Sequence, residues 1–391
     1  MADFQRVTDL ERSYAKEVLD GQFRKSVEGR MTERLETTFA GIFGVRYAIS
    51  HVNGTVTMHS ALAAAGVGPG DEVIVPALTM ASTAFAALYV QARPVFADVD
   101  PDTFTINPED VRRKITSRTR AVIPVSLYGL SPDLDPIMEL AREHDLTVIE
   151  DNAECVLGSY KGRLVGSIGD MASFSFQSSK HLTSGEGGML ITDDEELALK
   201  ARRFGNLGFA PTHAKAGGAK MPREKIQDPR FERHLSVGWN YRISELCAAV
   251  ALAQTERMEE IVDQRRRVAD MFRKAVSGCS WLVSQKVPEG YLHSYWTYVM
   301  RLETGGRFTW YDFRKKYLEA GGDGYYAAWV PVHLEPAFRN LGYGPGLCPV
   351  TEALQPKLLQ MKTNYTSLKI AREKADALAE TIDYFEKKYR L

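Results

Sequence analysis

The chain has 391 residues, of which 25% are charged, and its formal net charge is −1 at pH 7. This balance lacks the basic field typical of nucleic-acid-binding proteins, no apolar run approaches the roughly 18 residues of a membrane-spanning helix, and residues 1–19 contain no apolar signal core. The four cysteines have no metal-ligand spacing, so we expect no metal and reduced thiols in a cytoplasmic protein: Cys155, Cys247, Cys279 and Cys348.

Helix-like and strand-like segments alternate from about residue 30 to residue 256, which is typical of a parallel α/β sheet. The apolar strand-like segments are, in chain order, residues 72–76, 94–99, 121–125, 146–149, 171–176 and 188–192. Helix candidates such as residues 131–144 lie between them. We therefore predict a large α/β domain over residues 30–256.

The remainder predicts a second, smaller domain. Residues 245–276 have the pattern of one long helix that bridges the two domains. A strand at residues 298–302 and helices near residues 309–320 and 366–388 follow, which indicates a compact α+β domain over residues 257–391. We expect the N-terminal residues 1–29 to pack on this small domain.

The segment MASFSFQSSKHLTSGEGGMLITDD, residues 171–194, is the most informative part of the chain. Its first strand-like half delivers Lys180 into a turn of small polar residues, and a second strand follows. A lysine held and partly desolvated at a strand end can act as a Schiff-base nucleophile. The alternative is a surface lysine in an ordinary turn.

The segment LTVIEDNAE, residues 146–154, places Asp151 at the end of a buried strand. Ligands of open α/β sheets collect at the carboxyl ends of their strands. Pyridoxal phosphate needs an acid beside its pyridine nitrogen, because the protonated ring is the electron sink. Asp151 is a candidate for that acid, and a helix N-cap is the alternative.

The segment AISHVNGTVTMHSALAAAG, residues 48–66, passes from a short strand through Asn53-Gly54-Thr55 into a helix. Glycine lets backbone amides approach an anion, and the start of a helix offers unpaired N–H groups. This arrangement suits a cofactor phosphate. An ordinary capping turn is the alternative.

These segments belong to a longer ordered pattern. In chain order it consists of the motifs NGT-x-x-x-x-x-AL, GDEVIVPALT-x-x-ST, PVFADVD, VSLYG and VIEDNAE. The Lys180 segment, GWNYRISELCAA at 238–249 and CPVTEAL at 348–354 follow. In this order the chain resembles the DegT/DnrJ/EryC1/StrS family of sugar aminotransferases. The resemblance implies the pyridoxal-phosphate-dependent transferase fold of type I, with a mostly parallel seven-stranded sheet and a smaller C-terminal α+β domain.

The resemblance also implies roles for single residues. Lys180 is similar to the lysine that binds the cofactor covalently and moves the proton, and Asp151 to the partner of the pyridine nitrogen. The implied phosphate cradle consists of Gly54, Thr55 and Ser175. Asn240 resembles an asparagine that reaches the phosphate of the neighbouring subunit, which implies a homodimer with shared active sites. For Asn240 a turn residue is the alternative.

Two cofactor-side positions depart from many relatives. Met80 stands where an aromatic residue often stacks on the cofactor ring, although methionine can also pack on an aromatic face. Glu154 stands where glutamine is common, near the phenolic oxygen of the cofactor. A carboxylate there would oppose the phenolate unless it is protonated.

The substrate side departs further. GYYAAWVPVHLEP, residues 324–336, contains Tyr325 and His333 as candidate substrate contacts, with a histidine merely packed in a loop as the alternative. The irregular residues 205–235 carry several cations, among them Lys220 and Arg223, that could close over an anionic substrate. A solvated surface insertion is the alternative.

The function implied is transfer of an amino group from L-glutamate to a keto-sugar, first of all a nucleotide-linked keto-deoxy-sugar. Such amino sugars enter surface polysaccharides or natural products. The cofactor would alternate between pyridoxal and pyridoxamine phosphate. The alternatives are a keto-cyclitol aminotransferase, a pyridoxal-phosphate-dependent sugar dehydratase, in which histidine replaces the lysine, and a catalytically silent cofactor-binding dimer.

Overall fold

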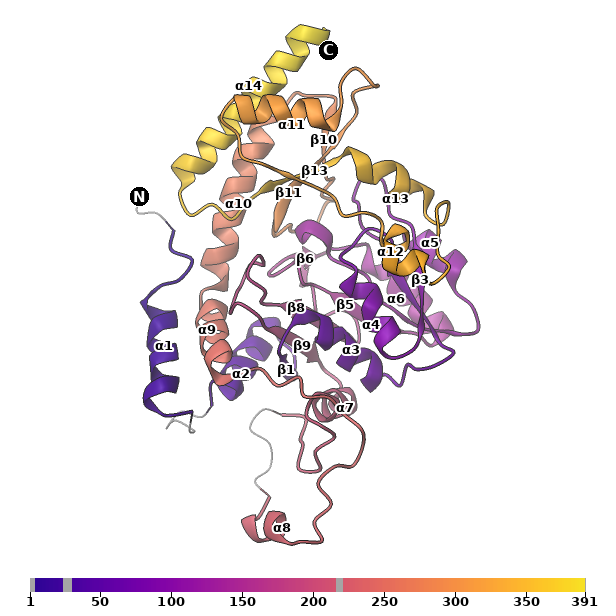
Figure 1. Cartoon of the computed structure of the whole chain (residues 1–391), viewed down its shortest axis with the longest axis vertical. Coiled ribbons are helices and arrows are strands. Elements are labelled where there is room, and N and C mark those ends of the chain that lie inside the picture. The colour runs from indigo at the N-terminus through magenta and orange to yellow at the C-terminus, as the bar shows by residue number, and fades with distance from the viewer. Residues whose placement is uncertain (1–3, 24–29, 216–220, 391) are drawn as a thin grey trace.

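A computed structural model describes residues 4–23, 30–215 and 221–390 (Figure 1). A seven-stranded sheet forms the centre of the large domain, in the order β1-β9-β8-β5-β4-β2-β3. Its strands are β1 (Tyr47–His51), β2 (Glu72–Pro76), β3 (Arg93–Ala97), β4 (Thr119–Val122), β5 (Thr147–Asp151), β8 (Met171–Ser175) and β9 (Gly188–Thr192). Only β9 runs antiparallel to its neighbours β1 and β8 in this described sheet. The predicted mostly parallel α/β sheet is confirmed.

Helices cover both faces of the sheet, which explains why its strands are largely apolar. They are α2 (Met31–Phe43), α3 (Gly54–Ala64), α4 (Ser82–Tyr89), α5 (Pro108–Lys114), α6 (Leu134–His144), α7 (Glu195–Gly205) and α9 (Glu245–Glu256). Alternate residues of β2 show the division. Val73 and Val75 pack in the apolar cluster that contains residues of α3, α4 and α7, whereas Ile74 packs with residues of α5 and α6.

The small domain carries a four-stranded antiparallel sheet in the order β10-β11-β13-β12. Its strands are β10 (Leu282–Ser284), β11 (Thr297–Leu302), β12 (Tyr326–Ala327) and β13 (Leu358–Lys362). Its helices are α10 (Met258–Ala275), α11 (Trp310–Glu319) and α14 (Leu368–Tyr389). The predicted small α+β domain is therefore present, and α10 runs into it from the large domain (Figure 1).

Short elements complete the described chain. They are α1 (Asp9–Asp20), α8 (Arg223–Gln227), α12 (Pro336–Arg339), α13 (Pro349–Leu354), the strand pair β6 (Ser159–Tyr160) and β7 (Arg163–Leu164), and the 3-10 turns η1 (Leu127–Gly129), η2 (Val332–Leu334) and η3 (Gln355–Lys357). No helix in the described ranges combines the length and apolar character needed to cross a membrane.

One expectation about the helices needs correction. The predicted long helix over residues 245–276 is two helices, α9 and α10, because Arg257 leaves helical geometry at φ −110° and ψ 12°. The N-terminal helix α1 packs along α9 (Figure 1), while the N–H of Phe4 donates to the Thr366 carbonyl directly before α14 at 2.9 Å. The buried Glu11 of α1 accepts hydrogen bonds there from Arg257 and Gln254 at 2.7 and 2.6 Å.

The C-terminal region also returns to the large domain. Val332, Phe338 and Cys348 are buried in the apolar cluster of the large sheet. Asp98, which follows β3, accepts hydrogen bonds from the backbone N–H groups of Val350 and Thr351 at 2.8 and 2.7 Å. Parts of residues 332–351 therefore also pack on the large domain, although they lie within the predicted small-domain range.

Candidate active site

A cavity of about 520 Å³ lies between the large sheet and the small domain. Asp151 ends β5, and the loop after β8 brings Lys180 to the same edge of the sheet. The lining residues are Asn53, Gly54, Thr55, Met58, Thr79, Met80, Ser82, Val125, Asp151, Ala153, Glu154, Ser175, Gln177, Ser179, Lys180, Glu186, Trp296 and Trp329. The cavity thus lies where ligands of open α/β sheets are expected to bind.

Lys180 is the cationic residue of this lining. Its side chain is only 14% exposed, and Nζ donates a hydrogen bond to Oε1 of Glu154 at 3.3 Å. Nζ also lies 4.5 Å from the centre of the Trp296 ring. An amine held by a carboxylate and an aromatic face is fixed and largely withdrawn from water, as a Schiff-base lysine requires.

The loop that carries Lys180 is held through its backbone. The Lys180 carbonyl accepts hydrogen bonds from the guanidinium groups of Arg265 and Arg6 at 2.8 and 3.0 Å. The Ser179 carbonyl accepts one from Nε1 of Trp296 at 2.9 Å. Arg6 lies near the N-terminus and Arg265 lies in α10, so distant parts of the chain fix the position of the amine.

Asp151 is buried and faces the same cavity. Its carboxylate accepts hydrogen bonds from the Thr83 hydroxyl at 2.9 Å and from the Ala153 N–H at 3.1 Å. Burial nevertheless raises the pKa of Asp151, because the desolvation of its charge outweighs these bonds and the attraction of Lys180. The ionised carboxylate is therefore costly unless a cation lies beside it.

Glu154 adds a second buried carboxyl group. The Tyr128 N–H donates to its Oε2 at 3.0 Å. Burial raises the pKa of Glu154 even with Lys180 beside it, and the charge of Asp151 raises it further. Two buried carboxyl groups thus share one lysine, and a ligand with a protonated ring nitrogen next to Asp151 would supply the missing positive charge.

The far end of the cavity is shaped for an anion. Gly54 begins α3, whose N-cap Asn53 accepts a hydrogen bond from the Val56 N–H at 3.1 Å. A Cβ atom at Gly54 would lie 2.8 Å from Cβ of Ser175, so a side chain there would fill the space. The backbone and hydroxyl groups of Gly54, Thr55 and Ser175 therefore form a cradle at a helix N-terminus, which suits a phosphate group.

These features fit pyridoxal phosphate. Lys180 would provide the amine for the aldehyde, Asp151 the acid for the ring nitrogen, and the start of α3 the phosphate cradle. Met80 and Glu154 also line the cavity.

Other predicted residues lie elsewhere. Asn240 does not line the cavity of its own chain, and it belongs to an exposed segment that also contains Val237 at 90% exposure. Lys220 lies outside the described residues, as does the side chain of Arg223 in α8. The segment around α8 projects from the end of the molecule opposite the small domain (Figure 1).

Two residues predicted to contact the substrate do not line the cavity. His333 is fully buried, and its Nε2 pairs with Oε1 of Glu352 at 2.8 Å. Tyr325 is 3% exposed, and its hydroxyl donates to the Trp310 carbonyl in the small-domain core. Both side chains are occupied by packing and by internal partners, so neither reaches the cavity.

Several residues of the site were not predicted from the sequence. Trp296 and Trp329 line the cavity from the small domain, and Arg6 and Arg265 hold the Lys180 loop. Trp329 lies within the divergent segment 324–336, where its aromatic side chain was the available signal. The other three have no local pattern that distinguishes them.

The fold and the cavity define a pyridoxal-phosphate-dependent transferase, and comparison with known proteins gives the family. Residues 5–382 match the DegT/DnrJ/EryC1/StrS aminotransferase family. The chain belongs to this family and is a pyridoxal-phosphate-dependent aminotransferase.

Particular relatives are similar over most of their length. GDP-perosamine synthase of Caulobacter vibrioides is 39% identical over 337 residues, 86% of each chain. A UDP-N-acetyl-3-dehydro-alpha-D-glucosamine 3-aminotransferase of Acidithiobacillus ferrooxidans is 35% identical. The match covers 85% of this chain and 83% of the relative's chain. An aminotransferase structure from Psychrobacter cryohalolentis superposes with a TM-score of 0.89 at 28% identity, covering 98% of this chain and 99% of its own.

The cradle yields a first prediction. Gly54→Ala should weaken the binding of pyridoxal phosphate by about tenfold, because the new methyl group would lie only 2.8 Å from Cβ of Ser175 and force the cradle to shift. Titration of the cofactor-free protein, followed by cofactor absorbance, measures this. Gly68→Ala is the matched control, since its Cβ would meet nothing within 4 Å. Equal affinity in Gly54→Ala and wild type would contradict the assignment.

A second prediction concerns the charge of Asp151. Its raised pKa means that the folded state binds the proton more tightly than the unfolded chain, so stability is lost as the pH rises through the folded pKa. Asp151→Asn should therefore make the cofactor-free protein more stable at pH 7, with the gain vanishing below the ordinary carboxyl range. The variant should also lose about a hundredfold or more in transamination rate.

Thermal melting at several pH values, together with the rate, tests both parts. A variant that melts below wild type at pH 7 would show that the Asp151 carboxylate stabilises the fold instead of straining it.

Proposed function

We propose that the protein transfers an amino group from L-glutamate to a nucleotide-linked keto-sugar in amino-sugar biosynthesis. A keto-deoxy-sugar is the preferred acceptor. The observation that carries this proposal is the fixed Lys180 amine, which shares a cavity with Asp151 and a phosphate cradle. The printed names of relatives support the acceptor class, since they include GDP-perosamine synthase and an aminotransferase of a UDP-linked dehydro-sugar.

The residues of the site divide the work. When bound, pyridoxal phosphate supplies the aldehyde that takes up the amino group and a ring that withdraws electrons from the reacting carbon. Lys180 Nζ removes a proton from the α-carbon of the donor and returns one to the acceptor. Asp151 keeps a proton on the ring nitrogen, and Glu154 balances the charge of Nζ while the amine is protonated.

The rival dehydratase depends on a histidine in place of the lysine. His181 directly follows Lys180, but its side chain is buried and does not line the cavity. Its Nε2 lies 3.0 Å from the Ser294 carbonyl, and burial lowers its pKa well below the ordinary value. The arrangement favours aminotransfer by Lys180.

The proposal includes a homodimer with shared active sites. In residues 235–240, the apolar residues Leu235, Val237 and Trp239 are 55%, 90% and 52% exposed. Apolar side chains gathered in one exposed segment are typical of a protein interface. A second copy that covers this segment would bring Asn240 next to the neighbouring cavity, and a two-fold axis would repeat the contact.

The proposal places the protein in the cytoplasm. The four cysteines are free, and Cys155 and Cys348 are buried. Burial raises the pKa of both thiols to about 12, so they stay protonated and unreactive. Free thiols without disulfides suit a reducing compartment.

Half-reactions test the proposed chemistry. With L-glutamate, the wild-type holoenzyme should convert its cofactor to the amine form, and a panel of keto-sugar nucleotides should then restore the aldehyde form. Lys180→Ala should slow both conversions by about a hundredfold or more, because the proton-transferring amine is gone. A wild-type enzyme that reacts with glutamate but with no keto-sugar nucleotide would refute the acceptor class.

Complementation tests the shared site. Lys180→Ala and Asn240→Asp should each be poorly active alone, the latter because a carboxylate repels the phosphate. Mixed and reassociated, they should recover about a quarter of wild-type activity, since half of the dimers are mixed and each has one intact site. Co-refolding each variant with itself is the control. No recovery in proven mixed dimers would mean that Asn240 serves its own chain.

A further inference from the structure

Two tryptophans form the wall of the cavity that the small domain contributes. Trp296 stands immediately before β11, and Trp329 follows β12. Both line the cavity beside Lys180, and their ring centres are 6.0 Å apart with 26° between the planes. The wall is therefore a nearly continuous aromatic surface.

This wall is held in place from the large domain. Nε1 of Trp296 donates to the Ser179 carbonyl at 2.9 Å. Trp329 stacks on the buried Tyr128, with ring centres 6.5 Å apart and 26° between planes. Tyr128 has φ of 62°, a left-handed conformation that costs energy for a tyrosine and persists only where its surroundings enforce it. Its N–H donates to Glu154, so the stack is tied to the carboxyl group that pairs with Lys180.

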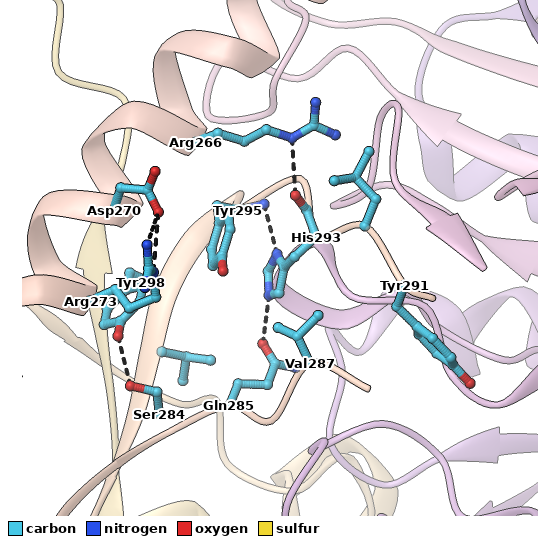
Figure 2. A pocket seen from close by; sticks show the side chains of 12 residues that line it. Arg266, Asp270, Arg273, Ser284, Gln285, Val287, Tyr291, His293, Tyr295 and Tyr298 are labelled. Carbon is cyan, nitrogen blue, oxygen red and sulfur yellow. Dashed lines mark hydrogen bonds and ion pairs between the residues drawn. The ribbon is translucent and has the colours of Figure 1, made fainter. Parts of the chain in front are cut away.

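The segment before Trp296 is also fixed in a second pocket (Figure 2), whose lining shares no residue with that of the active-site cavity. The His293 and Tyr295 rings stack with centres 3.8 Å apart. Nδ1 of His293 accepts the Tyr295 N–H at 2.8 Å, and Nε2 lies 3.0 Å from Oε1 of Gln285. Arg266 donates to the His293 carbonyl at 3.1 Å. The Trp296 ring is therefore positioned before any substrate enters.

We propose that Trp296 and Trp329 form the platform on which the sugar ring of the amino acceptor lies face-on; this inference rests on the proposed function. The faces of aromatic rings carry partial negative charge, and they attract the slightly positive C–H groups on the face of a sugar ring. The hydroxyl groups of the sugar stay at the ring edge, where they can form hydrogen bonds. A preformed aromatic wall needs no ordering on binding.

The position of Lys180 selects the sugar over the nucleobase as the stacked group. Nζ lies 4.5 Å from the Trp296 ring centre, so a group on the platform lies next to the proton-transferring amine. The keto carbon that receives the amino group belongs to the sugar ring. The nucleobase is separated from that carbon by a ribose and a diphosphate, so it would lie well away from Nζ.

Substitutions of Trp329 test the platform, because Trp296 also holds the Ser179 loop. Trp329→Ala and Trp329→Leu should each raise the KM for the keto-sugar nucleotide by about tenfold, and Trp329→Phe should recover most of the loss, since the interaction needs an aromatic face. The loss should be larger in the keto-sugar half-reaction than in the glutamate half-reaction in each variant, because glutamate has no ring to lie on the platform. Tyr326→Ala is the matched control, because Tyr326 is 66% exposed on β12 and does not line the cavity.

The outcomes separate the platform from the function on which it rests. If wild type aminates keto-sugars but Trp329→Leu performs as well as Trp329→Phe, or Trp329→Ala is unaffected, the platform is wrong and the function stands. An equal loss in the glutamate half-reaction would show that the wall holds the cofactor or the donor, which also overturns it. If wild type aminates no keto-sugar nucleotide, the proposed function and the platform both fail.

Discussion

The site depends on the burial of two carboxyl groups, Asp151 and Glu154, around a single lysine amine. Isolated charges are costly in a protein interior, and each of these carboxyl groups keeps a raised pKa although it accepts hydrogen bonds. The arrangement is therefore unbalanced without a cationic ligand. This imbalance explains why the site suits a protonated pyridine ring, because the ring completes the charge cluster and gains affinity from it.

Holding such a cluster requires support from distant segments. The Lys180 loop is held from outside as well as by its own hydrogen bonds. Arg6 and Arg265 donate to the Lys180 carbonyl, and Trp296 donates to the Ser179 carbonyl. Each of these three residues comes from a different part of the chain. The N-terminal segment, α10 and the segment before β11 thus meet at one turn. Their packing decides where the Lys180 amine lies.

The small domain contributes little to the charges and much to the shape of the site. Its tryptophans close one side of the cavity, while residues 331–354 return to the large sheet and anchor through Asp98. This return ties the domains together close to Trp329. In the proposed platform, a change in this wall would alter the fit of the acceptor while Lys180 and Asp151 stay in place.

Local patterns in the sequence determined the parallel sheet, its strands, and the placement of Lys180, Asp151 and Gly54 at one edge. Buried strands are continuous apolar runs, and the residues that follow them must lie at the sheet edge, so these features need only neighbours in sequence. The tertiary structure decided the break at Arg257, the docking of α1 on α9, and the burial of His333 and Tyr325. It also decided the convergence of Trp296, Trp329, Arg6 and Arg265 on the site. The Lys180 loop, for example, is held by partners 85 to 174 residues away in sequence, and a local sequence pattern cannot predict such contacts.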